Sequence, residues 1–279
     1  MPSLTFNQYG KTRVRLTQVL RRDDRHELVE LSVKILFTGD FADSYTRADN
    51  SIVLPTDTMK NTVYALARQR PILSIEQFAM DLGRHFLGRV AHLLRVQVEI
   101  EQRPWIRIGQ HDSAFVVGGQ ERRVTNLLAT REGEQISSGF HGLEILKTGN
   151  SAFAGFLKDE LTTLPETRDR LFGTVLDANW TYRSGEIDFN KEYERARSVL
   201  LDSFANHVSE SVQHTLYDMA VAALNSSELI SEVHLMMPNK HRLLVDLTRF
   251  GLDNPNQIFV PTDEPSGYIE ARVSADEGR

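Results

Sequence analysis

The stretch Leu28–Thr38, LVELSVKILFT, decides which kind of fold this chain can adopt. Apolar residues occupy every second position and mostly polar residues lie between them; the apolar series is Val29, Leu31, Val33, Ile35 and Phe37. Because successive side chains of a strand point to opposite faces, this alternation predicts a strand that is buried on one face. A similar alternation at Val14–Leu16 precedes the polar turn Asp23–His26. The two stretches together predict an antiparallel hairpin.

Two helical stretches follow this hairpin, and strands follow the helices. Thr56 or Asp57 is expected to cap the first helix. The second helix begins at Ser74 with SIEQ, the sequence of a capping box. Strand alternation returns over Leu94–Ile100, and further strands are expected within Ala114–Thr130.

The second half of the chain repeats this order of elements more loosely. Its expected elements are strands around Leu143–Ile145 and Val175–Tyr182, helices over Lys191–His207 and Glu210–Leu224, and strands at Val233–Met237, Leu243–Leu247, Ile258–Val260 and Tyr268–Val273. Asn150–Arg170 is expected to form a loop with short helices, and Ser209 is expected to cap the second long helix. The predicted fold class is therefore α+β, with two consecutive units at residues 1–138 and 139–279.

Composition limits the possible classes of function. The 279 residues carry a net charge of -6, which argues against a general nucleic-acid binder. The chain has no cysteine, so disulfides, thiolate zinc sites and cysteine nucleophiles are excluded. No apolar run is long enough to span a membrane, and the N-terminus lacks the pattern of a signal peptide. The last residues, DEGR, are not a peroxisomal signal, so the cytoplasm is the expected location.

Common catalytic motifs are missing from the sequence. It contains no P-loop, no Rossmann glycine fingerprint, no zinc-binding His-Glu-x-x-His and no Gly-x-Ser-x-Gly elbow. His207 and His214 are separated by a predicted break between helices, and His85 and His92 have no third ligand near them in the sequence. A metal site is therefore not expected.

Seven motifs nevertheless follow one another in the order of a known family. SIVLPTDTMKNT at Ser51–Thr62 resembles the urate oxidase signature, in which a Thr-Asp pair precedes a helix that begins with Lys-Asn-Thr. The other matches are YGK at Tyr9–Lys11, SYTRADN at Ser44–Asn50, NSAFAGFLKDELTTL at Asn150–Leu164, ETRDR at Glu166–Arg170, SVQHTLY at Ser211–Tyr217 and PNKH at Pro238–His241. The ordered set covers nearly the whole chain, so chance is a poor explanation for the resemblance to urate oxidases.

This resemblance implies a fold and a reaction. The fold is the tunnelling fold, in which each half is a ββααββ unit with an antiparallel sheet and helices on one face. Four chains would assemble into a barrel, a homotetramer with active sites at the subunit interfaces. The implied reaction oxidises urate with O2 and water to 5-hydroxyisourate and hydrogen peroxide, without a metal or other cofactor. Because urate is electron-rich, it can itself supply the electrons that a flavin would otherwise carry.

The resemblance also implies roles for the residues that match the motifs. Lys11, Thr56 and His241 resemble the family's Lys–Thr–His proton relay. Arg170 and Gln213 resemble the pair that holds the planar substrate by its edge. Thr56 also belongs to the implied substrate contacts, together with the backbone of Asp57 and of Val212. The ring of Phe153 would stack on the substrate, and Asn239 would orient water or oxygen.

The chemistry of these side chains agrees with the implied roles. The planar guanidinium of an arginine can bind two acceptors in one plane and favours an anion. A glutamine amide both donates and accepts hydrogen bonds, and a phenylalanine ring stacks on a flat aromatic ligand. The protonation states within the relay are left open by the sequence.

Simpler interpretations exist for each of these residues, and two other functions stay open. Thr56 and Asp57 can act as helix caps, and Asn239 can be a residue of a hairpin turn. The chain could also be a zinc-dependent pterin or purine hydrolase with the same fold, or a non-catalytic purine-binding barrel. Zinc content and a turnover assay distinguish these alternatives.

Overall fold

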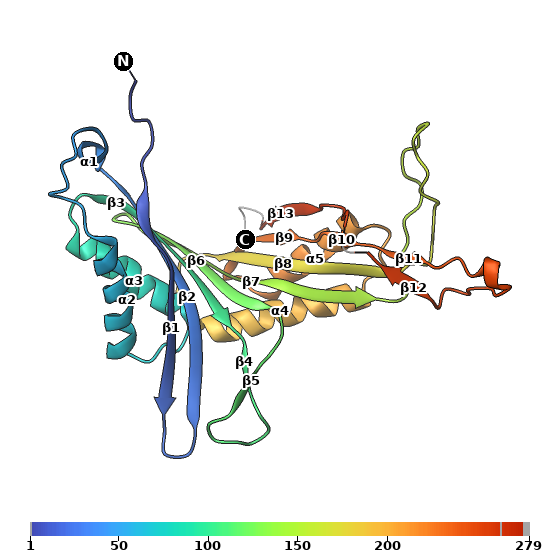
Figure 1. Ribbon diagram of the computed structural model, residues 1–279, viewed down its shortest axis with the longest axis horizontal. Coiled ribbons are helices and arrows are strands. Elements are labelled where there is room, and N and C mark those ends of the chain that lie inside the picture. The colour runs from blue at the N-terminus through green and yellow to red at the C-terminus, as the bar shows by residue number, and fades with distance from the viewer. Residues whose placement is uncertain (1, 263, 276–279) are drawn as a thin grey trace. The chain divides into compact units, whose positions relative to one another are not determined.

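The computed structural model describes residues 2–262 and 264–275, which form two compact units (Figure 1). Unit 1 comprises Met1–Phe140 and Thr181–Lys191, and unit 2 comprises His141–Trp180 and Glu192–Arg279. The division into 1–138 and 139–279 stays a prediction from the sequence. Asp276–Arg279, on which the expected lack of a peroxisomal signal rests, lie outside the described residues.

Unit 1 is an antiparallel sheet covered on one face by helices. β1 pairs with β2, β2 with β3 and β3 with β6, each pair antiparallel. The helices α2 and α3 pack on this sheet through contacts with β1, β3 and β6 (Figure 1). The elements are β1 Tyr9–Arg21, β2 His26–Gly39, α1 Ala42–Thr46, α2 Thr56–Gln69, α3 Ile75–Arg89, β3 Leu93–Arg103, β4 Trp105–Arg107, β5 Phe115–Val117 and β6 Arg122–Thr130.

The core of unit 1 confirms the strand predicted from alternation. In β2 the side chains of Val33, Ile35 and Phe37 are fully buried, and the residues between them are only half-buried. The ring of Phe37 meets that of Phe86 on α3, with 5.0 Å between the ring centroids. The hydrophobic side of β2 therefore faces the helices, and its polar side lies on the opposite face of the sheet.

Unit 2 repeats the same layered arrangement. Its strand order is β7-β8-β9-β13, and α5 packs on β9 and β13. The elements are β7 Glu134–Lys147, β8 Phe172–Tyr182, α4 Phe189–Asn206, α5 Val212–Ser226, β9 Ile230–Met236, β10 Asn239–Lys240, β11 Arg242–Leu244, the 3-10 helix Thr248–Phe250, β12 Phe259–Pro261 and β13 Glu270–Ser274. The main elements of both units thus follow the predicted order ββααββ, although β7 and β8 contribute residues to each unit. No helix of the described chain is both long and apolar enough to cross a lipid bilayer.

The ends of the helices test the capping predictions. Ser74 is confirmed, because its side chain accepts a hydrogen bond from the backbone N–H of Gln77 at 3.2 Å. The prediction that Thr56 or Asp57 caps a helix is wrong, since both belong to α2 and the residue before them is Pro55. Pro55 occupies the N-cap position and has no side-chain acceptor, so no side chain caps the first N–H groups of α2.

Two further local predictions are also wrong. Ser211, and not Ser209, caps α5. Asn150–Arg170, all of which the structure describes, contains no helix. Both differences have one cause: Ser209 and the Asn150 segment form hydrogen bonds with each other, and these are contacts over a long sequence distance that local patterns do not contain.

Candidate functional site

A pocket of about 520 Å³ in unit 2 brings together six of the residues singled out from the sequence. They are Phe153, Arg170, Val212, Gln213, Asn239 and His241. The volume lies in the usual range for sites that bind small molecules. The other three residues, Lys11, Thr56 and Asp57, belong to unit 1.

Backbone hydrogen bonds fix the segments that surround this pocket. Ser209 is fully buried; its N–H donates to the carbonyl of Asn150 at 2.9 Å, and its carbonyl accepts from the N–H of Ala152 at 2.7 Å. Phe153 and Thr167 exchange two N–H···O bonds of 2.8 and 3.0 Å. The chain that carries Phe153 is therefore tied both to the residues just before α5 and to the segment that leads to Arg170.

Arg170 brings unpartnered hydrogen-bond donors to the pocket. Its Nε and Nη2 atoms are buried and have no hydrogen-bond partner among the described residues. Burial lowers the pKa of this guanidinium, which is still a cation at physiological pH. Its Cζ atom lies 5.4 Å from the centroid of the Phe153 ring and 5.8 Å from that of Phe172. A buried cation with free donors beside an aromatic ring suits a flat anionic ligand.

The N-terminus of α5 adds backbone donors to the same pocket. Val212 and Gln213 are the first two residues of this helix. The Ser211 hydroxyl accepts the N–H of His214 at 3.1 Å, so it satisfies only one of the free N–H groups of the first turn. The positive end of the helix dipole favours a negative charge at this position. The Val212 side chain is buried, whereas that of Gln213 is exposed and can reach a ligand.

Asn239 and His241 reach the pocket from β10 and the residue after it. Asn239 pairs with Thr174 of β8, and its N–H donates to the carbonyl of Gly267 at 2.8 Å. The interpretation of Asn239 as a residue of a hairpin turn is therefore wrong, because the residue lies in a strand. The carbonyl of His241 accepts the N–H of Thr262 at 3.0 Å, which fixes the backbone that carries the imidazole.

In unit 1, Lys11 follows a position with no room for a side chain. A Cβ atom at Gly10 would lie 1.9 Å from the carbonyl oxygen of Ile35 on β2. The register of β1 against β2 shifts between Lys11 and Val14, and Arg13 has a φ of 56°. Such a bulge changes the direction of neighbouring side chains, so the local backbone determines where Lys11 points.

Thr56 and Asp57 form the first turn of α2, whose early N–H groups are free for a ligand. The carboxylate of Asp57 accepts hydrogen bonds from Lys60 and, at 3.0 Å, from Asn61. The pKa of Asp57 is lowered, chiefly by Lys60 and also by the charge of Lys11. Because the Asp57 side chain is held by its own helix, its backbone is the group left for a ligand.

Several pocket residues were not singled out from the sequence. The most informative are Leu171, Asn256 and Ile269, which line the same pocket. Asn256 has a φ of 55°, and its amide donates to the carboxylate of Asp169 at 3.0 Å. Only the Asn-Pro-Asn sequence, which is typical of turns, gives a local signal for Asn256. The apolar residues have no local signal at all.

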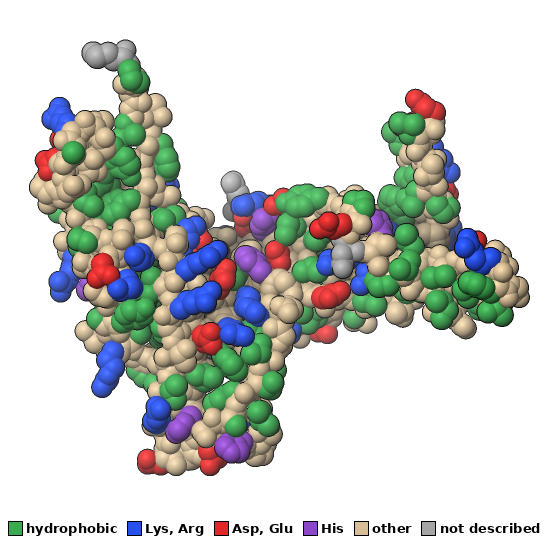
Figure 2. All heavy atoms as spheres, viewed as in Figure 1, with side chains coloured by type: hydrophobic (Ala, Val, Ile, Leu, Met, Phe, Trp, Pro, Cys, Tyr) green, Lys and Arg blue, Asp and Glu red, His purple; other side chains and the backbone are tan. Residues whose placement is uncertain are grey.

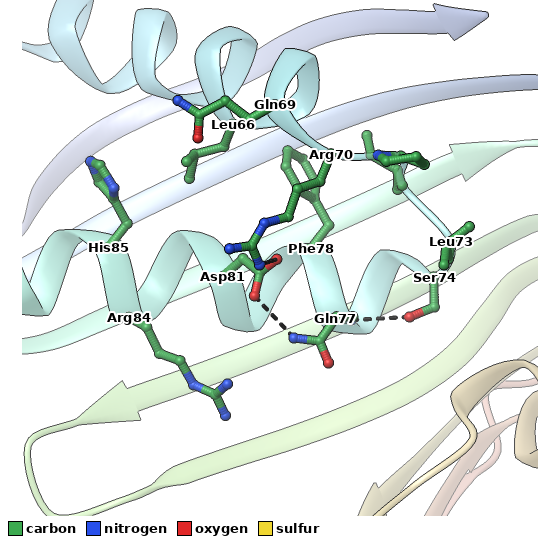
Figure 3. A pocket seen from close by; sticks show the side chains of 12 residues that line it. Leu66, Gln69, Arg70, Leu73, Ser74, Gln77, Phe78, Asp81, Arg84 and His85 are labelled. Carbon is green, nitrogen blue, oxygen red and sulfur yellow. Dashed lines mark hydrogen bonds and ion pairs between the residues drawn. The ribbon is translucent and has the colours of Figure 1, made fainter. Parts of the chain in front are cut away.

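A second hollow, of about 720 Å³, lies in unit 1 beside α2 and α3 (Figure 3). Its polar groups pair with one another: Gln77 donates to Asp81 at 3.0 Å, and Arg70 lies 3.8 Å from the same carboxylate. Arg84 forms a two-pronged ion pair with Glu134 through two bonds of 2.8 Å. Because these charges already have partners, this hollow is a weaker candidate than the pocket that contains Arg170.

Comparisons with known proteins agree on one family. A family model described as uricase matches residues 7–127 and 136–270. A uricase from Arthrobacter globiformis is 41% identical over 273 residues, which cover 98% of this chain and 90% of that protein. A uricase from Dictyostelium discoideum is 35% identical over 286 residues, which cover 100% of both chains. The crystal structure of the uricase from Arthrobacter globiformis has a TM-score of 0.97 and covers 100% of this chain and 97% of that chain, at 40% identity.

Proposed function

The chain belongs to the uricase family, and from this premise we propose that it oxidises urate with O2 and water to 5-hydroxyisourate and hydrogen peroxide. In this reaction urate loses two electrons, O2 accepts them and becomes peroxide, and water supplies the new hydroxyl oxygen. The observation that supports the proposal most directly is the pocket lined by Phe153, Arg170 and Gln213, in which two donor atoms of Arg170 have no hydrogen-bond partner among the described residues.

In the proposed complex, Arg170 and Gln213 hold the purine by its edge. The free Nε and Nη2 atoms of Arg170 donate to two acceptors in the plane of the urate anion. The N-terminus of α5, with the backbone of Val212, adds a donor and a favourable dipole. The Phe153 ring stacks on one face of the purine and excludes water from that face. Asn239 orients water or O2 over the other face.

Proton transfer is assigned to Lys11, Thr56 and His241. Lys11 takes a proton through the hydroxyl of Thr56, and His241 continues the relay. Proton transfer by positioned groups of this kind typically contributes about 10² to 10⁴ in rate. Thr56 and Asp57 also offer the backbone of the first turn of α2 to the purine. The urate anion itself is the reductant, so the proposal includes no metal and no other cofactor.

We further propose that the active form is a homotetramer with active sites at subunit interfaces. In this proposal Lys11 and Thr56, in unit 1 of one subunit, complete the relay with His241, in unit 2 of another subunit. Unit 2 also exposes apolar side chains over β11, β12 and the segment between them (Figure 2). They are Leu243, Leu244, Phe250, Leu252, Ile258 and Val260. Apolar surface of this extent is typical of contacts between subunits.

For location and other partners we keep the expectations from the sequence. The proposed cellular location is the cytoplasm. Urate and O2 are the proposed small-molecule partners. The acidic net charge of -6 supports neither nucleic acid nor an anionic membrane surface as a partner.

Neither alternative function gains support. Among residues 2–262 and 264–275, no three His, Cys, Asp or Glu side chains are arranged to hold a metal ion, so one described chain offers no ligand set for a zinc hydrolase. A non-catalytic purine-binding barrel would have no need for the relay residues Lys11, Thr56 and His241, and all three are present.

In the decisive experiment, purified protein that has been treated with a metal chelator is mixed with urate in oxygenated buffer. We expect loss of urate absorbance together with about one peroxide formed for each urate consumed, as the balanced reaction requires. The same chelated sample is examined by elemental analysis. Urate binding without turnover would support the non-catalytic barrel, and turnover that required added zinc and formed no peroxide would support the hydrolase.

A further inference from the structure

The ring of Phe153 has an aromatic neighbour within its own loop. The rings of Phe153 and Phe156 stack nearly in parallel, with 4.8 Å between centroids and 16° between planes. Gly155 has a φ of 72°, a left-handed conformation that lets the chain reverse between the two phenylalanines. A contact at this short sequence separation therefore depends on the turn at Gly155.

The second ring is held on its own side by a charged pair. The Nζ atom of Lys158 lies 5.6 Å from the centroid of the Phe156 ring. The same ammonium forms an ion pair of 2.7 Å with Glu166, on the returning arm of the loop. Next to Glu166, Thr167 exchanges backbone hydrogen bonds with Phe153. Lys158, Phe156 and Phe153 thus stack on one another. The ion pair with Glu166 and the backbone hydrogen bonds of Thr167 connect the two ends of this stack.

We propose that Phe156 is a positioning residue for substrate binding. By stacking on the Phe153 ring, it fixes the plane of that ring, against which a flat purine would stack beside the Arg170 guanidinium. This inference rests on the proposed function, because it assigns urate as the ligand that stacks on Phe153. A free half-buried phenylalanine would have to be ordered when the ligand binds, whereas a ring already held in plane avoids that loss of entropy.

The test compares Phe156→Leu with Phe156→Tyr in the full-length protein. Phe156→Leu keeps an apolar side chain but removes the flat ring, and we expect the urate KM to rise about three- to tenfold, the scale of one aromatic contact. We expect kcat to change by less than about twofold, because the relay groups are untouched. Phe156→Tyr retains the ring and should keep the parental KM. Glu160→Gln, an exposed change on the same loop, is the control for nonspecific effects on the loop.

A second measurement separates positioning from a role in folding. Urate binding without O2 should weaken in Phe156→Leu by the same factor as KM, while thermal unfolding of the remaining structure stays cooperative. If Phe156→Leu does not fold, Phe156→Met, which has a flexible side chain of similar volume, takes its place. A parental KM and a parental affinity in these variants would overturn the inference even though the parent enzyme turns over urate. Absence of turnover in the parent would instead refute the proposed function.

Discussion

The phenol oxygen of Tyr9 accepts a hydrogen bond of 3.1 Å from the backbone N–H of Leu54. Tyr9 lies two residues before Lys11 on β1, and Leu54 lies two residues before Thr56 at the start of α2. The ring of Tyr9 is held edge-on against Phe41, with 4.8 Å between the ring centroids. A single side chain thus links the strand that carries the proposed base to the turn that carries the proposed relay hydroxyl.

The link predicts a specific defect for Tyr9→Phe. The ring contacts are retained and only the hydrogen bond is lost, a contribution of about 0.5–1.5 kcal/mol. We expect kcat to fall about two- to tenfold, because Thr56 is less well placed for proton transfer. KM should stay close to the parental value, because Arg170 and Gln213 are untouched. Tyr64→Phe is the matched control, because it removes a hydroxyl of α2 that donates to the carbonyl of Arg15 at 3.4 Å, a contact with β1 four residues after Lys11. A rise in KM without a loss of kcat would contradict this assignment.

Lys11→Met should abolish most of the turnover without abolishing urate binding. The substitution keeps the length of the side chain and removes the amine, so kcat should fall by about 10² or more, the usual scale for general acid–base catalysis. Steady-state kinetics gives kcat, and equilibrium binding of urate without O2 gives the affinity. A variant with normal kcat would show that Lys11 has no part in the relay.

Arg170→Gln should give the opposite profile. It removes the fixed cation and two aligned donors, and each charge-assisted hydrogen bond contributes about 1.5–3 kcal/mol. We therefore expect the anaerobic affinity for urate and the KM to weaken more strongly than kcat. Arg168→Gln, an exposed arginine of the same loop, controls for the change of net charge. Tight urate binding by Arg170→Gln would exclude the proposed grip.

Assembly can be tested by mixing two inactive variants. If Lys11 of one copy and Arg170 of another complete one site, co-refolded Lys11→Met and Arg170→Gln chains regenerate intact sites. A reciprocal interface with random pairing gives about a quarter of the parental activity. Light scattering on the same mixture should show the tetramer. If the mixture stays inactive although mixed oligomers form, each site is built from a single chain.

Stability should fall in mildly acidic buffer because of His207. Burial lowers the pKa of this imidazole below its ordinary value of 6.5, while Asp218 opposes the shift and His214 and Lys147 support it. The unfolded chain therefore binds the proton more tightly than the folded one. The free energy of unfolding should be greatest above pH 6.5 and decline as the pH falls from there toward the lowered pKa. Urea unfolding at several pH values measures this slope.

A variant at the same position provides the control for this slope. His207→Gln removes the titrating group, so the decline below pH 6.5 should become shallower. His111→Gln changes an exposed histidine and should leave the slope as it is. If both variants retain the parental pH dependence, His207 is not the source of the acid sensitivity.

The sequence predicted the fold where the decisive pattern was local. Alternation in β2 and the Ser74 cap both depend on neighbours in the chain, and both are confirmed. Two serines two residues apart, Ser209 and Ser211, look equally suitable as caps of α5. Only the distant partner of Ser209 at Asn150 decides between them. The same reason explains the helices wrongly expected in the loop before β8.

The candidate site likewise contains residues that the sequence could indicate and residues whose contacts it could not. Arg170 and Gln213 were singled out because they sit inside ordered motifs, and both line one pocket of the structure. Tyr9 and Phe156 lie inside two of those motifs, yet nothing in the letters shows that one holds Leu54 and the other stacks on Phe153. Supporting contacts of this kind depend on geometry across a turn or between elements, which residue type alone does not encode.

The exposed apolar side chains of β11 and β12 bear on how the enzyme should be handled. In an assembled oligomer this apolar surface would be buried, whereas a dissociated chain would expose it to other dissociated chains. Dilution would favour dissociation, and the dissociated chains would then inactivate by irreversible aggregation. The rate of this loss would depend on protein concentration and not on the melting temperature of the separate chains. The dissociation rate of the oligomer would therefore determine how long the enzyme stays active in storage.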